Sequence, residues 1–332
     1  MHEITLLLVL VVALALVFDF INGFHDTANA VATVIATRVL TPRQAILMSG
    51  ILNFAGAMVA TAVATTIAKG VIDPKQASET VVLAAVLGAI TWNLVTWVYG
   101  IPSSSSHALV GGLIGAGMAK GGESIVQWQK IFDKIILPLI FSPIAGFIIG
   151  LILMSIITFF FARSHPLQTG PWFKKLQLLS SAAMSFVHGQ NDGQKSMGII
   201  TLALFAHHII SKVEVPVLVK VACAIAMGLG TSAGGYRIIA TVGHRILRLE
   251  PVQGFTAETT GASVILTASH FGWPVSTTHI ITGSVFGVGA ARRLSAVRWK
   301  VAIQMVCAWV ITIPASALVA GLAYKLINTV TR

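Results

Sequence analysis

Two short polar motifs lie inside otherwise apolar sequence, and each contains one aspartate. The first covers residues 22–29 (NGFHDTAN) and the second covers residues 188–195 (HGQNDGQK). When the motifs are aligned, Asp26 falls on Asp192, and glycine and amide residues flank both acids. A carboxylate placed in a hydrocarbon environment costs about 3 kcal/mol or more, and it is normally kept for a task such as ion passage. Two such carboxylates at matching positions predict a transporter.

The aspartate motifs are rich in oxygen ligands that suit a hard cation such as sodium. Glu258 is another acid inside an apolar segment, and it is a candidate third cation ligand or proton carrier. The predicted sodium ligands are Asp26, Asn22, Asp192, Asn191 and Glu258. Gly23, Gly189 and Gly193 would permit an unwound backbone whose carbonyls also coordinate. The alternative is a buried structural ion pair, which suits the second motif because its lysine stands three residues after the acid.

A second pair of motifs combines a proline, a run of hydroxyl residues and a histidine. Residues 101–107 (IPSSSSH) and 273–279 (WPVSTTH) match at a constant offset of 172 positions. Each motif predicts a helix start, because proline is tolerated in a first turn and Ser or Thr caps backbone N–H groups. Uncovered N–H groups at membrane depth form an anion site. The predicted oxyanion ligands are Ser104, Ser105, Ser106, Ser276, Thr277, Thr278, Gln190, Asn29 and Lys195. The alternative for the hydroxyl residues is close helix packing.

The composition is that of a polytopic membrane protein. Over 332 residues the chain is 55% hydrophobic and 10% charged, with a mean hydropathy of +0.86, which a soluble domain does not reach. The long apolar runs are Ile4–Ile21, Ala45–Ala68, Val81–Val98, Ile135–Phe161, Val215–Val242 and Val301–Leu326. Weaker segments rich in Gly, Ser and Thr lie at 24–37, 103–119, 176–205, 255–271 and 275–291. We expect ten to twelve membrane segments in total, some of them half-spans. The net charge of +11 is scattered in short loop groups, so nucleic acid is not an expected partner.

Both motif pairs indicate an internal duplication. We expect a first repeat at residues 1–160, a linker at 161–175 and a second repeat at 176–332. Basic loops prefer the cytoplasm, which puts residues 292–300 and the linker inside and residues 120–134 outside. Both chain termini would then be external. The sequence therefore predicts an all-α polytopic membrane protein of two inverted-topology repeats, with interrupted helices and hairpin-like half-helices.

The paired motifs resemble those of a known family. NGFHDTANA and HGQNDGQK, with Pro-x-Ser-Ser/Thr-Ser/Thr-His in both halves, are similar to the PiT family of inorganic phosphate transporters over nearly the whole chain. The resemblance implies phosphate symport with sodium or protons, and functional roles for Asp26, Asp192 and Glu258. Asn53 stands where animal members have an acid. We therefore expect an inner (plasma) membrane protein that binds phosphate, sodium ions and lipid and needs no cofactor. Homo-oligomer formation is left open.

Electrostatics predicts that cations accompany the anion. At about 4 Å and an effective dielectric of 20, two like charges repel by roughly 4 kcal/mol, so a doubly charged phosphate and two aspartates need counterions. Sodium symport is the favoured prediction. Proton or metal-phosphate symport and transport of another tetrahedral oxyanion such as sulfate are the alternatives. A passive channel would be poorly served by buried aspartates. An enzyme with a Ser nucleophile is not expected, because the hydroxyl motif is duplicated and lacks a nucleophile elbow.

Overall fold

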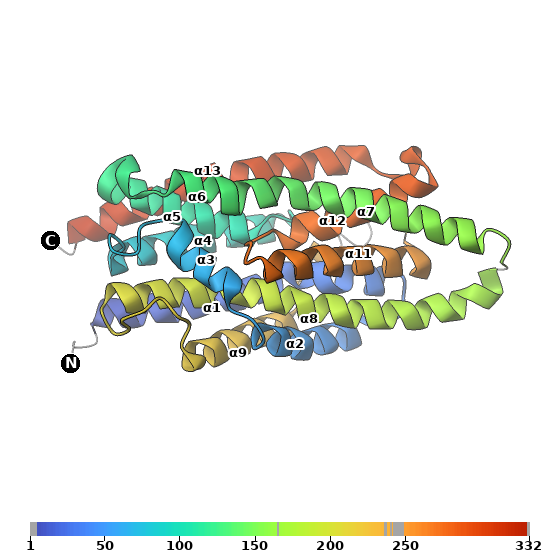
Figure 1. The fold of residues 1–332 in the computed structure, drawn as a ribbon, viewed down its shortest axis with the longest axis horizontal. Helices are drawn as coiled ribbons and strands as arrows, with labels where there is room; N and C mark the ends of the chain where they lie inside the picture. Colours follow the sequence, from blue (N-terminus) through green and yellow to red (C-terminus); the bar gives the residue numbers. More distant parts are fainter. Residues whose placement is uncertain (1–4, 165, 236–237, 240, 242–248, 331–332) are drawn as a thin grey trace.

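The computed structural model describes residues 5–164, 166–235, 238–239, 241 and 249–330, and nearly all of them are helical. The helices lie along one long axis (Figure 1). In chain order they are α1 (Leu6–Ala36), α2 (Pro42–Ala57), α3 (Ala62–Gly70), α4 (Glu79–Val98), α5 (Ser105–Gly121), α6 (Trp128–Ile131), α7 (Leu137–Phe161), α8 (Pro166–Ala206), α9 (Val217–Ala233), α11 (Pro251–His270), α12 (Thr277–Arg292) and α13 (Trp299–Val330). The predicted all-α class is confirmed.

The apolar runs of the sequence correspond to helices of spanning length. Among the residues that the structure describes, four stretches are long and apolar enough to cross a membrane, namely α1, α4, Trp128–Phe161 and α13. A fifth is the pair α2 and α3, which is bent by 69° at a short break. The run Val215–Val242 begins as α9, and its end lies outside the described residues. The weaker segment 24–37 is not separate, because α1 continues through it without a break.

Two helical hairpins enter the molecule from opposite ends (Figure 1). One consists of α4 and α5, and the other of α11 and α12. Gly100 and Gly272, which are 172 positions apart, both adopt positive φ angles of 63° and 69° where the first helix of each hairpin ends. Glycine takes this conformation without steric penalty. The tips meet, since the Ser106 hydroxyl donates to the Val275 carbonyl at 2.9 Å. The hairpin-like half-helices are therefore present.

The two repeats run in opposite directions. Helix α8 is antiparallel to α1, and α13 is antiparallel to α7 (Figure 1). Both chain termini lie at one end of the molecule, and the turn between α7 and α8 lies at the other. Helix α8 begins at Pro166, so most of the predicted linker 161–175 is helical. This arrangement is the predicted inverted repeat.

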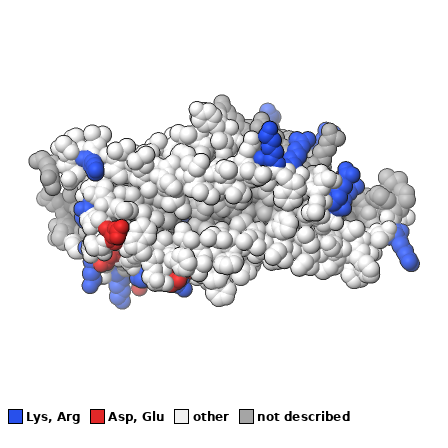
Figure 2. Space-filling model, turned by 90° about the horizontal axis from the view of Figure 1, so that it is seen from above, with Lys and Arg blue, Asp and Glu red and all other residues white. Residues whose placement is uncertain are grey.

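Charged side chains gather at the two ends. On the face shown in Figure 2, the end with the termini carries both acids and bases, and the opposite end carries only Lys and Arg. The middle of this face is free of charge. An uncharged belt between two charged ends is typical of a protein that spans a bilayer.

The core has two apolar parts with a polar layer between them. The N-terminal part of α1 packs with α4 and α5 in the first, and its C-terminal part packs with α11 and α12 in the second. Helix α8 also runs through both apolar parts, with Met197 in the first part and Met184 in the second. The aspartate motifs and both hairpin tips therefore meet in the polar layer.

Candidate functional site

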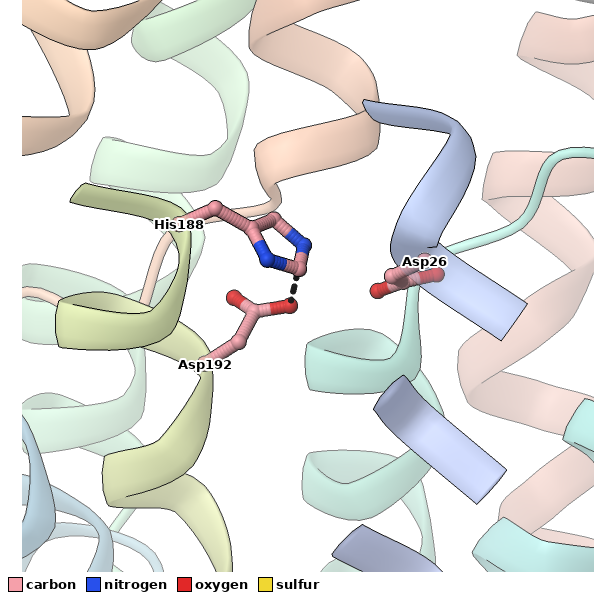
Figure 3. Close-up of side chains that lie close together, drawn as sticks. All are labelled: Asp26, His188 and Asp192. Atoms are coloured by element: carbon pink, nitrogen blue, oxygen red, sulfur yellow. Dashed lines mark ion pairs between the residues drawn. The ribbon is translucent and has the colours of Figure 1, made fainter. Parts of the chain in front are cut away.

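The two motif aspartates face each other across the polar layer. Asp26 projects from α1, and Asp192 projects from α8 beside His188 (Figure 3). One oxygen of each carboxylate and one ring nitrogen of His188 all lie within 4.8 Å of one another, and all three residues are buried. These acids come from different repeats, so the duplication has produced one shared site.

Asp26 is held by neutral donors and a histidine. The Ser105 hydroxyl, in the first turn of α5, donates to Asp26 Oδ2 at 2.8 Å. His25 Nδ1 lies 2.6 Å from Asp26 Oδ1, and His25 Nε2 lies 3.1 Å from the Thr96 hydroxyl of α4. Asp26 therefore contacts the first hairpin both directly and through its neighbouring histidine.

Asp192 has a counterion of its own. Lys195 Nζ lies 2.8 Å from Asp192 Oδ1, as expected for residues three apart on a helix. His188 Nε2 lies 3.4 Å from Asp192 Oδ2. The Thr277 hydroxyl, in the first turn of α12, donates to Asp192 Oδ2 at 3.3 Å. The first turn of each hairpin helix thus supplies a hydroxyl to the aspartate of its own repeat.

Each hairpin hydroxyl also binds the other repeat. Lys195 Nζ donates to Ser105 Oγ at 3.0 Å, and Asn29 Nδ2 donates to Thr277 Oγ1 at 3.2 Å. Ser105 and Thr277 are equivalent, and so are Asn29 and Lys195. These contacts form a pseudo-symmetric chain whose two ends, Asp26 and Asn29, stand three residues apart on α1, and we call this arrangement the central ring. Its members are Asp26, Ser105, Lys195, Asp192, Thr277 and Asn29. With the two acids ionised and the lysine protonated, the central ring carries one net negative charge.

The predicted oxyanion ligands occupy three places. Ser105, Thr277, Asn29 and Lys195 belong to the central ring, and Thr278 accepts a 2.8 Å bond from Asn29. Ser104 and Ser276 cap α5 and α12 by accepting from the backbone N–H of His107 and His279 at 3.2 Å, and Ser106 bonds across the hairpin tips. Gln190 lines a cavity of about 750 Å³ with residues 60–62, 266–267 and 269–270.

The predicted sodium ligands are only partly brought together. Asp26 and Asp192 meet, and Asn22 is buried in the polar layer one turn before Asp26. Asn191 turns away to donate to the Ser269 hydroxyl at 2.8 Å. Glu258 lies in a separate cluster. A single site made of all five predicted ligands is therefore not formed.

The Glu258 carboxylate is fully held by side-chain donors. Thr33 donates to it at 2.5 Å, Gln177 at 3.2 Å and Ser180 at 2.5 Å. Thr33 is seven residues after Asp26 on α1, which places this cluster about 10 Å from Asp26 along the helix. Glu258 thus links α1, α8 and α11.

The prediction of an unwound backbone at the motif glycines is wrong. Helices α1 and α8 run through both aspartate motifs without interruption. The glycines allow helices to pack closely instead. A Cβ atom at Gly23 would lie 2.6 Å from the Met227 carbonyl oxygen of α9, and one at Gly189 would clash with the backbone of Asn53.

Two residues of the polar layer were missed in the sequence. His188 stands four residues before Asp192, a spacing that places both on one helix face. Its Nδ1 lies 2.7 Å from the Asn53 side-chain oxygen, so position 53 contacts the site through this histidine. Asp19 is fully buried seven residues before Asp26, again on one helix face. His188 opens the second aspartate motif but was given no role, and Asp19 lies outside both motifs in a long apolar run.

Comparison with known proteins agrees with this geometry. The model of the phosphate transporter family matches twice, at residues 22–172 and 162–320, once for each repeat. The chain belongs to the phosphate transporter family. A probable low-affinity inorganic phosphate transporter of Bacillus subtilis is 48% identical over 99% of this chain and 100% of that protein. One from Rhizobium meliloti is 49% identical over 96% of both chains.

A solved structure shares the whole fold with this member of the phosphate transporter family. It is described as the sodium-dependent phosphate transporter, and it matches with a TM-score of 0.90 and 26% identity. The match covers 98% of this chain and 100% of that chain. The predicted relationship to inorganic phosphate transporters is confirmed.

Proposed function

We propose that this protein imports inorganic phosphate by symport with sodium ions. The central ring is the observation that carries the proposal. It joins two buried carboxylates, one ammonium group and the hydroxyls of both hairpin helix starts. Helix N-termini favour anions such as phosphate, and carboxylates favour hard cations. The ring therefore offers ligands for both kinds of cargo within one layer of the membrane.

The charge of the central ring explains why the two cargoes would bind together. The ring has one net negative charge before a substrate arrives, and hydrogen phosphate adds up to two more. Like charges about 4 Å apart repel by roughly 4 kcal/mol even at an effective dielectric of 20. Sodium ions at Asp26 and Asp192 would remove this repulsion. Each ligand would then raise the affinity for the other by the same factor.

The hairpin hydroxyls are placed to exchange partners during this binding. In the structure, Ser105 joins Asp26 to Lys195, and Thr277 joins Asp192 to Asn29. When sodium takes over the carboxylates, both hydroxyls become free to donate to phosphate oxygens. Lys195 and Asn29 can follow them, because each already bonds to one of these hydroxyls.

Uptake of radiolabelled phosphate into proteoliposomes tests the proposal. We expect an inward sodium gradient at fixed pH to drive accumulation above the external concentration. Asp26→Asn should need about tenfold more sodium or more for the same effect, whereas Glu123→Gln, at an exposed acid just after α5, should not change it. Equal uptake with and without a sodium gradient would reject sodium symport.

A second candidate is proton-coupled or metal-phosphate symport. The cluster of Asp26, His188 and Asp192 favours it, because two carboxylates and an imidazole suit a divalent transition metal ion and can also carry protons. Phosphate uptake in sodium-free liposomes that requires a divalent metal or a proton gradient would select this mechanism. Competition by sulfate would show whether the site distinguishes tetrahedral oxyanions.

We also propose the membrane orientation from the charge distribution. On the face in Figure 2, the charged residues at the end with the α7–α8 turn are all Lys or Arg. The loop at 292–300 lies at this same end of the molecule (Figure 1). Basic loops prefer the cytoplasm, so we place this end inside a bacterial inner membrane and both termini outside. Labelling of a cysteine introduced at Lys130 from outside intact cells would test this orientation.

A further inference from the structure

Asp19 is a buried carboxylate for which the central ring has no use. It lies on α1 with 0% of its surface exposed. Neither of its oxygens has a hydrogen-bond partner among the residues that the structure describes. Glu258 gives the contrast, since three side chains donate to it. Buried polar atoms are almost always bonded, so a carboxylate with two open oxygens needs an explanation.

Other buried polar atoms without a hydrogen-bond partner lie near Asp19. Ser196 of α8 and Cys223 of α9 are its neighbouring polar side chains. Asn22 lies one turn further along the same face of α1. Within the described part of the chain, the Ser196 hydroxyl and both amide atoms of Asn22 also lack partners. These groups without hydrogen-bond partners form a cluster that contains two carboxylate oxygens, an amide oxygen and a hydroxyl.

The carboxylate of this cluster lies apart from the central ring, and Asn22 and Ser196, each four residues from a ring aspartate, lie between the two. Asp19 precedes Asp26 by seven residues, which is about 10 Å along a helix. It lies on the side of the ring that faces the end with both termini (Figure 1). Lys195 is the nearby cation, but its ammonium group already contacts Asp192 and Ser105. No described basic side chain forms an ion pair with Asp19.

We propose that Asp19, Asn22 and Ser196 form a second sodium site, distinct from the one at Asp26 and Asp192. All the open acceptors are hard oxygens, which suits sodium and disfavours a soft metal. A proton is the competing ligand, since a protonated Asp19 would donate a hydrogen bond to Asn22 or Ser196, and the test below therefore counts both sodium ions and protons. The site lies between the central ring and the terminal end, which we place outside, so a sodium ion entering from outside meets it before the ring.

Equilibrium binding of ²²Na⁺ to the purified full-length protein tests this site without any transport step. We expect Asp19→Asn to bind one sodium ion fewer per chain than the wild type. Glu123→Gln, an exposed acid, should bind the wild-type number. An unchanged sodium count in Asp19→Asn would overturn the proposal, and so would a lost proton-binding step with the sodium count retained.

A pair of matched variants keeps the test valid if Asp19→Asn does not fold. Ser196→Ala should raise the dissociation constant of this sodium ion by about tenfold, equivalent to about 1.4 kcal/mol. Cys223→Ala removes one atom from the other neighbour of Asp19 and should leave the constant unchanged, because a thiol is a poor sodium ligand. Equal effects of the two variants would indicate a packing role and reject the site.

The proposal rests on sodium as the coupling ion, but the two can fail separately. If Asp19→Asn loses a sodium ion while phosphate uptake is independent of sodium, the site is correct and the coupling is wrong. If uptake needs sodium but the sodium count of Asp19→Asn is normal, the coupling is correct and the site is wrong.

Discussion

The two halves of the central ring have the same geometry and different charge. Asp26 and Asp192 are equivalent, and each accepts a bond from the equivalent hydroxyl, Ser105 or Thr277. The residue three positions later is Asn29 in the first half and Lys195 in the second. Asp192 therefore has a permanent counterion, whereas Asp26 contacts that lysine only through Ser105. The duplication kept the scaffold, and divergence at one position gave a lysine partner to Asp192 alone, whereas the ion-pair partner of Asp26 is His25 at 2.6 Å.

Removal of the permanent counterion should have the largest effect. Lys195→Met leaves Asp192 buried without its partner, and breaking a buried ion pair typically costs about 3–5 kcal/mol. We expect a large loss of thermal stability in sodium-free buffer, measured by the unfolding temperature, with partial recovery in sodium. Asn29→Leu, the equivalent change in the other half, should cost less. Equal losses in the two variants would show that the halves do not differ in charge dependence.

Neutralising each acid should affect sodium dependence unequally. Asp26→Asn should raise the sodium concentration for half-maximal phosphate uptake by about tenfold or more, because a 1.4 kcal/mol loss has that effect. In Asp192→Asn the freed Lys195 can stand in for a cation, so phosphate uptake should fall while its sodium requirement becomes weaker. Uptake at varied sodium measures both. Full sodium-coupled uptake by both variants would reject the scheme.

The hairpin hydroxyls should have smaller and graded effects. Ser105 donates to Asp26 at 2.8 Å, and Thr277 donates to Asp192 at 3.3 Å. Hydrogen bonds to charged groups contribute about 1.5–3 kcal/mol, so Ser105→Ala should weaken phosphate binding by at least about tenfold. Thr277→Val should weaken it less, because Ser105 also binds the charged Lys195, whereas Thr277 binds the neutral Asn29. Phosphate titration of the purified variants gives the two phosphate dissociation constants. A weaker affinity in Thr277→Val than in Ser105→Ala would contradict the assigned contacts.

Glu258→Gln should change phosphate affinity least. Glu258 belongs to a separate cluster with Thr33, Gln177 and Ser180. A glutamine can still accept bonds from some of these donors, and the central ring is about 10 Å away along α1. We expect equilibrium phosphate binding within about threefold of the wild type, although the uptake rate depends on helix movement and can fall further. A loss of affinity as large as that of Ser105→Ala would place Glu258 in the ring.

Local patterns in the sequence predicted the scaffold well. The duplicated hydroxyl motifs predicted two helix starts, and α5 and α12 begin within them, because capping depends on a few adjacent residues. The constant offset of 172 positions likewise predicted the paired hairpins. The inverted orientation followed from the basic loops, which depend only on composition.

Contacts between the repeats could not be predicted in this way. The bond from Lys195 to Ser105 joins residues 90 positions apart, and only the packing of α8 against the first hairpin creates it. Glu258 was grouped with the aspartates because it is acidic and in an apolar segment, but its position on α11 puts it elsewhere. Asp19 was hidden inside a long apolar run, where a hydropathy average conceals a single acid.

The proposed mechanism requires phosphate and cations to bind to this site together. The most direct measurement is the phosphate dissociation constant of the purified protein, at fixed pH, as sodium is replaced by a large organic cation at constant ionic strength. We expect the phosphate dissociation constant to rise at least about tenfold without sodium, and saturating phosphate to lower the sodium dissociation constant by the same factor. A phosphate dissociation constant that does not change with sodium would contradict the proposed coupling.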